Sequence, residues 1–189
     1  MTFVDNHDTD RWHSVAGDLP RTRYGIGLVM MTRGLPCLYY GTEIGMDGFA
    51  APDGLVRGDF PGGWAEDARS AFTSDERNQE EEQLWRFTAA LGQARRQYRQ
   101  AFSSPMAHLI PRGGQYHFLR SDGRQHLLVL TNASDEPAEL NWSQLAPLRR
   151  NAEECRSILG AAGDGPAALE WGDSVTLKPW HFAVYRIDD

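Results

Sequence analysis

The chain changes its character once along its length, at Ser103-Ser104-Pro105. Before this point the chain has long segments whose apolar residues have the spacing of helices. One short apolar run precedes the first of these segments and another follows it. After this point come short segments of alternating apolar and polar residues, separated by turn clusters. The first pattern indicates an α/β unit, and the second is typical of an antiparallel β-sandwich. We therefore expect an α/β part over residues 1–104, followed by an all-β domain over residues 105–189.

The α/β part begins with a short apolar run ending in Phe3-Val4, which we interpret as a strand leading into a polar loop. A helix is expected over 19–33, with Asp18 as its N-cap and Pro20 in its first turn. This helix is apolar over much of its circumference, so we expect it to be well buried. Residues 35–40 form a continuous apolar run of the kind found in parallel strands.

A long loop rich in Gly, Pro and Asp spans residues 41–78, and loops of this length in compact domains are often functional. A second helix follows, where Asn78 and Glu81 have the spacing of a capping box. Its apolar residues recur every three or four positions and predict one buried stripe. The residues of the stripe are Leu84, Phe87, Leu91, Ala94, Tyr98 and Phe102.

Alternation in the second half predicts which side chains share a face of a sheet. Near the C-terminus, Phe182 and Val184 are expected to oppose Ala183, Tyr185 and Ile187. Similar sets earlier in the domain are Tyr116 with Phe118; Ala138, Leu140 and Trp142; and Val175 with Leu177.

Composition excludes several classes of partner. The 189 residues carry 19 Lys and Arg against 26 Asp and Glu, a net charge of −7. An acidic chain is poorly suited to phosphate backbones or anionic membrane surfaces, so we expect no nucleic acid and no membrane partner. No apolar run approaches the roughly 20 residues that span a bilayer.

Isolated residues also carry expectations. Cys37 lies in the run LPCLYY and is expected to be a buried small hydrophobe. Trp85 and Trp142 are expected in the helix and sandwich cores. The two cysteines of the chain, Cys37 and Cys155, cannot form a disulfide framework or a four-cysteine zinc site.

The string Asp5-Asn6-His7-Asp8 directly after the first strand is the sharpest chemical signal. Its carboxylate, amide and imidazole groups suit hydrogen bonding to a sugar, and a carboxylate there would stabilise positive charge. A polar turn held by Asx hydrogen bonds explains the same residues. The spacing of Asp5, His7 and Asp8 fits no standard set of metal ligands, so we expect neither a metal nor another cofactor.

FVDNHD followed by TDR resembles the last sequence motif of the α-amylase family of glycoside hydrolases (glycoside hydrolase family 13), which lies at the end of the seventh barrel strand. GLPCLYYGTEIGM at 34–46 resembles the family's eighth strand and the loop after it. LVRGDFPGGW at 55–64 is similar to a loop of the neopullulanase and cyclomaltodextrinase branch. The resemblance implies that residues 1–104 are the last two β/α units of a TIM barrel, since a complete barrel needs about 250 residues.

The resemblance also implies roles for individual residues. Asp8 matches the carboxylate that stabilises the transition state, and His7 matches a histidine that hydrogen-bonds the same sugar. Asn6 is expected to hold the loop, while Arg11 is expected to contact sugar or pair with Asp8.

Two aromatic residues of the long loop, Phe60 and Trp64, are candidates for a sugar-stacking platform. The family's nucleophile and general acid come from motifs on the fourth and fifth strands, which would precede residue 1. Arg57-Gly58-Asp59 resembles the nucleophile motif only superficially, and Glu43 is expected to form a salt bridge that caps its loop.

The sequence thus predicts part of a retaining hydrolase of α-1,4-glucosidic bonds in maltodextrin, cyclodextrin or pullulan, with the chain inactive by itself. The partner is an α-glucan. Two barrel strands alone leave unpaired edges at Phe3-Val4 and at 35–40, so self-association is expected. The alternative function is a non-catalytic β-sandwich module that binds carbohydrate or serves structure.

Overall fold

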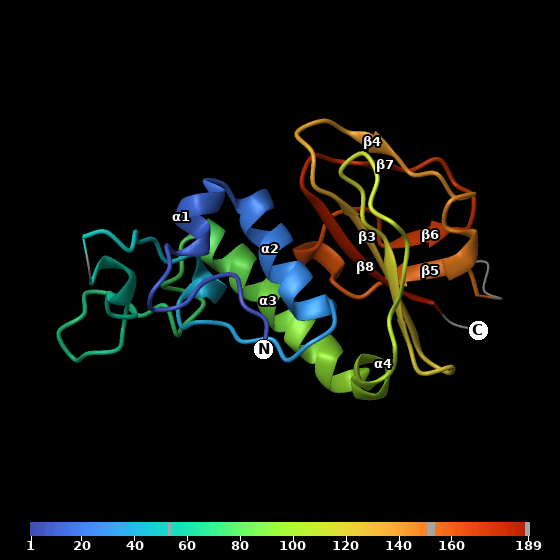
Figure 1. Ribbon diagram of the computed structural model, residues 1–189. Coiled ribbons are helices and arrows are strands. Elements are labelled where there is room, and N and C mark those ends of the chain that lie inside the picture. The colour runs from blue at the N-terminus through green and yellow to red at the C-terminus, as the bar shows by residue number, and fades with distance from the viewer. Residues whose placement is uncertain (53, 151–153, 188–189) are drawn as a thin grey trace. The chain divides into compact units, whose positions relative to one another are not determined.

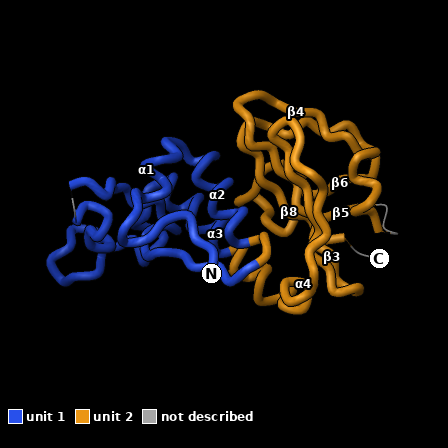
Figure 2. Tube along the Cα trace, viewed as in Figure 1, with its two compact units in different colours: residues 1–30, 34–89 blue, residues 31–33, 90–189 orange. Residues whose placement is uncertain are grey.

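The computed structural model describes residues 1–52, 54–150 and 154–187 (Figure 1). The chain divides into two compact units, which are coloured separately in Figure 2. Unit 1 comprises residues 1–30 and 34–89, and unit 2 comprises residues 31–33 and 90–189. The change between units falls inside the second long helix, and a domain boundary near residue 104 stays a prediction.

Unit 1 is built from helices and loops. Its elements are α1 (Trp12–Ala16), α2 (Leu19–Met31), the 3₁₀ turns η1 (Thr42–Ile44) and η2 (Leu55–Arg57), and the first half of α3 (Gln79–Gln97). The start of α2 is as predicted, because Asp18 Oδ1 accepts a hydrogen bond from the Arg21 N–H at 2.8 Å. The expected burial is confirmed too, since every helix residue after Pro20 is buried or half-buried.

The capping box of α3 is confirmed. Asn78 Oδ1 accepts hydrogen bonds from the N–H groups of Glu80 and Glu81, and Glu81 Oε2 accepts one from the Asn78 N–H at 2.8 Å. The short helix α4 (Arg99–Ser103) follows, so the helical part ends at the predicted serine. The fully buried residues of the predicted stripe are Leu84, Phe87, Leu91, Ala94 and Tyr98.

The two strands expected in unit 1 are reduced to one parallel bridge between Thr2 and Pro36. The Thr2 N–H donates to the Leu35 carbonyl at 2.9 Å, and the Cys37 N–H donates to the Thr2 carbonyl at 2.8 Å. Parallel strands are normally covered on both faces, but Leu35 is 71% exposed. Cys37 lies in the same uncovered segment and is exposed as well, so the prediction that it is buried was wrong.

The expectation for Trp85 was also wrong. The indole is 40% exposed on α3, outside the buried stripe, and the Arg77 guanidinium lies 4.3 Å from the centre of its ring. Trp142 is half-buried and packs at the edge of the unit 2 core, with its ring centre 4.8 Å from that of Trp171.

Unit 2 contains two antiparallel sheets. The larger has the strand order β1-β2-β3-β8-β5-β6, and β4 pairs with β7 in the smaller. The strands are β1 (Ala107–His108), β2 (Phe118–Ser121), β3 (His126–Asn132), β4 (Ala138–Glu139), β5 (Glu154–Ser157), β6 (Ala168–Glu170), β7 (Thr176–Leu177) and β8 (His181–Ile187). Two short 3₁₀ turns, η3 (Ala146–Leu148) and η4 (Gly160–Ala162), lie before and after β5.

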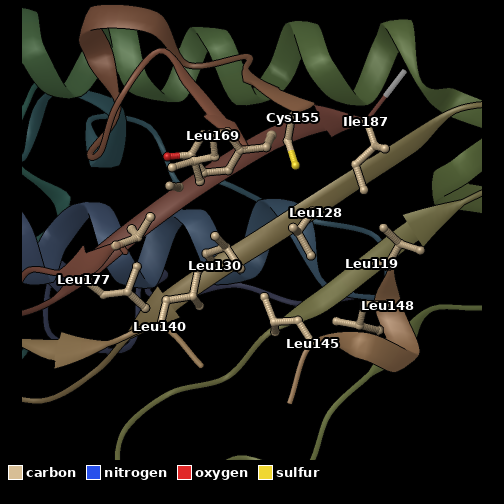
Figure 3. Packing of buried hydrophobic residues seen from close by; sticks show 13 residues of the cluster. Leu119, Leu128, Leu130, Leu140, Leu145, Leu148, Cys155, Leu169, Leu177 and Ile187 are labelled. Carbon is tan, nitrogen blue, oxygen red and sulfur yellow. The ribbon is translucent and has the colours of Figure 1, made fainter. Parts of the chain in front are cut away.

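One face of the larger sheet packs against side chains from the β4–β7 pair and from η3 (Figure 3). The predicted alternation in β8 is confirmed, because Ala183, Tyr185 and Ile187 belong to this core while Phe182 and Val184 lie on the other face. That opposite face is buried as well. Burial raises the pKa of the Tyr185 phenol, and it raises the pKa of the Cys155 thiol to about 11. Among the described residues, no helix has the length and apolar character to cross a membrane.

A buried histidine precedes β2. His117 is 5% exposed, its Nδ1 accepts a hydrogen bond from the Thr131 N–H at 3.3 Å, and its Nε2 lies 3.0 Å from Gln115 Oε1. Burial, with a smaller repulsion from His181, lowers the pKa of His117 to about 4.

We expect this histidine to make unfolding pH-dependent. Between pH 6.5 and pH 4 the unfolded chain binds a proton at residue 117 and the folded chain does not, so stability falls as the pH falls through this window. The loss is up to about 3 kcal/mol, because one unit of pKa shift corresponds to about 1.4 kcal/mol. Urea unfolding at about pH 7 and about pH 4 checks it, comparing wild type with His117→Gln. Equal losses of stability in the two proteins would contradict the expectation.

Candidate functional site

The candidate site lies on the loop between the Thr2 bridge and α1. A buried carboxylate anchors this loop: Asp5 is 2% exposed, and its Oδ2 accepts a hydrogen bond from the Trp12 N–H at 2.9 Å. Its Oδ1 accepts a second from the Thr42 hydroxyl at 2.8 Å. Asp5 therefore fixes the loop to the start of α1 and to η1 at the same time.

The residues after Asp5 turn outward. Asn6 Oδ1 accepts a hydrogen bond from the Asp8 N–H at 2.7 Å, and the Asn6 N–H donates to the Thr9 hydroxyl at 3.0 Å. These contacts form a local Asx-type turn. The turn presents both His7 and Asp8 to solvent, with side chains 61% and 66% exposed.

Asp8 binds a neighbour on each carboxylate oxygen. The His7 Nε2 lies 3.1 Å from Asp8 Oδ2, and the Arg57 Nη2 lies 3.1 Å from Asp8 Oδ1. The Arg57 Nε also donates a hydrogen bond to the His7 carbonyl at 3.1 Å. Arg57 thus holds both the carboxylate and the backbone of the pair, which we call the His7–Asp8–Arg57 cluster.

Arg57 reaches this cluster from η2, in the long loop. The preceding residue, Val56, is 1% exposed and anchors the turn in the core of unit 1. After Arg57, the Tyr40 hydroxyl donates to the Gly58 carbonyl at 3.0 Å. Sequence reasoning missed this role and considered Arg57 only as part of a lookalike motif. The sequence signal available for this role was that Arg57 is a cationic residue in a long loop, and long loops of this kind are often functional.

Among the described residues, Arg11 forms no ion pair or hydrogen bond with Asp8, and its alternative role, contact with sugar, stays a prediction. Its side chain is fully buried, and the guanidinium lies 4.2 Å from the Tyr39 ring centre and 4.8 Å from that of Tyr40. The Nη1 donates to the Tyr40 carbonyl at 2.5 Å, while Nε and Nη2 have no hydrogen-bond partner among the described residues. Burial and the neighbouring Tyr40 raise the pKa of Tyr39, against an opposing effect of Arg11.

The two aromatic candidates of the long loop differ in exposure. Phe60 is half-buried and its ring centre lies 4.6 Å from that of Phe72. The Trp64 side chain is exposed, with the residue 64% exposed overall, and the Trp64 backbone N–H donates to Asp67 Oδ2 at 3.1 Å.

Two other expectations concern charge in this unit. Glu43 lies in the middle of η1, and it forms no ion pair with any described residue, so the expected capping salt bridge is not present. A separate point is that the described part of the chain, in both units, holds no group of three His, Cys, Asp or Glu side chains arranged to bind a metal ion.

Comparison with known protein families identifies the class of protein to which this chain belongs. Residues 1–153 match the family described as alpha amylase, catalytic domain. This match covers most of the chain, which therefore belongs to the alpha-amylase family of glycoside hydrolases.

The relatives are glucan-processing enzymes. A cyclomaltodextrinase from Geobacillus thermopakistaniensis is 27% identical over 191 residues, covering 100% of this chain and 29% of the relative. A cyclomaltodextrin glucanotransferase from Bacillus sp. (strain 38-2) is 39% identical over 57 residues, covering 30% of this chain and 8% of the relative. This chain thus spans less than a third of the length of these relatives.

Solved structures share the fold. An Anoxybacillus alpha-amylase superimposes with a TM-score of 0.73 at 22% identity, covering 99% of this chain and 37% of the other. A gamma-CGTase from alkalophilic Bacillus clarkii gives a TM-score of 0.72 at 22% identity, covering 100% and 26%.

We expect Arg57→Gln to release the cluster while leaving the fold intact. An ion pair this exposed contributes about 0.2–1 kcal/mol, so the loss of unfolding free energy should stay below about 1 kcal/mol. The carbon NMR signals of the His7 carbonyl and the Asp8 carboxylate should shift, because both groups lose a direct contact with Arg57.

Arg69→Gln is the matched control for this experiment. Arg69 lies in the same loop and its side chain is 43% exposed, against 44% for Arg57, but it pairs with Glu81 instead of Asp8. Its substitution should therefore leave the His7 and Asp8 signals in place. Unchanged His7 and Asp8 signals in Arg57→Gln would contradict the contact.

Proposed function

We propose that this chain is part of a retaining glycoside hydrolase that cleaves α-1,4-glucosidic bonds of maltodextrins, cyclodextrins or pullulan. The observation that carries the proposal is the exposed His7–Asp8–Arg57 cluster on a chain of the alpha-amylase family. The names of the relatives support a glucan substrate, because a cyclomaltodextrinase matches along the whole chain.

In this proposal Asp8 stabilises the transition state. Glycoside cleavage passes through an oxocarbenium-like state, and a fixed carboxylate beside the sugar lowers its energy. The carboxylate is held on both oxygens before any ligand arrives, so little reorganisation is needed. His7 hydrogen-bonds a hydroxyl of the same sugar, and Asn6 holds the loop by accepting a hydrogen bond from the Asp8 N–H.

The remaining site residues act around this pair. Trp64 is the sugar-stacking surface, since its ring is exposed, and Phe60 supports the loop by packing on Phe72. Arg11 acts as a positioning residue that fixes Tyr39 and Tyr40, because its buried guanidinium stacks on both rings.

We also propose the architecture that the sequence motifs imply. Residues 1–104 are the last two β/α units of a TIM barrel, which the parallel bridge between Thr2 and Pro36 supports. Residues 105–189 are a β-sandwich, which the shared core of the two antiparallel sheets supports. The exposed Phe3 and Leu35 at the bridge favour self-association of the separate chain.

The separate chain should not hydrolyse glucans. A retaining mechanism needs two carboxyl groups about 5–5.5 Å apart that serve as nucleophile and acid. The cluster supplies only Asp8, whose oxygens bind His7 and Arg57. Incubation with maltoheptaose and a chromogenic maltoside checks this, with Glu43→Gln and Asp8→Asn chains beside wild type. Turnover that either substitution abolishes would show that the chain holds its own machinery.

In an active protein that contains this chain, Asp8→Asn should lower kcat at least about 100-fold and change KM much less, because the charge acts chiefly in the transition state. Steady-state kinetics on maltoheptaose measure both constants. Asp59→Asn removes an exposed carboxylate of the long loop and should leave kcat within about twofold of wild type. If Asp8→Asn kept a wild-type kcat, the proposed role of Asp8 would be abandoned.

A further inference from the structure

Unit 2 contains a cavity of about 450 Å³ at the beginning of its larger sheet. This volume falls within the range of about 300–1,000 Å³ that is usual for small-molecule sites. The residues that line it come from β1 and the turn after it, from the approach to β2, and from the region of η3. They are His108, Leu109, Ile110, Arg112, Gln115, His117, Gln144 and Pro147.

A buried hydrogen-bond chain fixes one wall of this cavity. The Thr131 N–H donates to His117 Nδ1, which assigns the ring proton to Nε2. That N–H then donates to Gln115 Oε1 at 3.0 Å. The carbonyl end of the Gln115 amide is therefore used, and its NH₂ group stays available as a donor. His117 remains neutral near pH 7, because burial lowers its pKa to about 4.

Two further polar side chains at the cavity have no partner of their own. Neither the Arg112 guanidinium nor the Gln144 amide forms a hydrogen bond or ion pair with another group in the described ranges of the chain. Among the described residues that line the cavity none is Asp or Glu, so the cavity lacks the carboxylate oxygens that Ca²⁺ and Mg²⁺ prefer. It offers a set of planar hydrogen-bond donors instead.

Apart from His108, the rest of the lining is apolar. Leu109 is half-buried, Pro147 belongs to η3, and Ile110 is 77% exposed at the rim. A lining that combines apolar carbon surface with planar amide and guanidinium groups matches the two kinds of surface on a pyranose ring. Its C–H faces are apolar, while its hydroxyls both accept and donate hydrogen bonds.

We infer that this cavity binds a glucose unit of an α-glucan, with Gln115, Arg112 and Gln144 as its hydrogen-bonding groups. All the residues of this site belong to unit 2, and none belongs to the His7–Asp8–Arg57 cluster. The choice of glucose as the sugar rests on the proposed function. Such a site would hold glucan without acting on its bonds.

Titration of the 189-residue chain with maltotriose, followed by calorimetry and by NMR of the histidine rings, tests the inference. We expect saturable binding that shifts the ring signals of His108 and His117. Gln115→Leu should weaken binding about tenfold, because it leaves sugar hydroxyls unpaired. Arg112→Ala and Gln144→Leu should weaken it by several-fold, and their exposed positions keep the fold unaffected.

Matched controls lie on the turn between β2 and β3. Arg124→Ala and Gln125→Leu remove the same residue types from exposed positions of the same unit and should leave binding unchanged. Undiminished binding in all three cavity variants, or absence of binding by the wild-type chain, would overturn the inference. Tighter binding of inorganic phosphate than of maltotriose would overturn the sugar assignment.

Asp8→Asn separates this inference from the proposed function. Maltotriose binding that Asp8→Asn abolishes and Gln115→Leu preserves would place the sugar at Asp8 and reject the cavity. Conversely, cavity binding together with a wild-type kcat in the Asp8→Asn enzyme would reject the role of Asp8 and keep the cavity.

Discussion

The buried carboxylate of Asp5 is the contact on which the candidate site depends. A carboxylate inside a protein is costly unless its oxygens are satisfied, and here each oxygen accepts a hydrogen bond, from Trp12 and from Thr42. Those two partners lie at the start of α1 and in η1, outside the loop that bears His7 and Asp8. The loop therefore has a fixed base, and the residues directly after Asp5 have to turn outward. A rigid base under an exposed pair is the arrangement that a preorganised binding site requires.

Unit 2 obtains its order from a different source. Its central strands β3 and β8 are buried on both faces, so the larger sheet is held by apolar packing on two sides. Asn132, at the end of β3, donates to the Glu136 and Lys178 carbonyls and so fixes the turns beside β4 and β7. Thr131, one residue earlier, donates its N–H to His117. The sheet thereby positions the buried wall of the cavity, although the cavity residues themselves lie mostly in loops.

Features that depend on residues close together in the sequence could be predicted from it. Features that depend on which distant elements cover a side chain could not. The caps at Asp18 and Asn78 need only partners three residues away, so the sequence contains all the information for them. The alternation of β8 is equally local. Burial of Cys37 and Trp85 depends on which elements lie above them, and both proved exposed. Arg57 was missed because 49 residues separate it from Asp8, in a loop that has no periodicity.

The two arginines near the candidate site show why closeness in sequence misleads. Arg11 is near Asp8 along the chain, but it lies at the start of α1, where its side chain is enclosed by the rings of Tyr39 and Tyr40. A cation enclosed in this way is fixed and cannot follow a ligand. Arg57 is 44% exposed, and an ion pair with such exposure is worth only about 0.2–1 kcal/mol. In the role proposed for Asp8, a sugar hydroxyl can therefore replace Arg57 on the carboxylate at little cost. His7 and Arg57 hold the carboxylate in place, and its 66% exposure keeps it accessible.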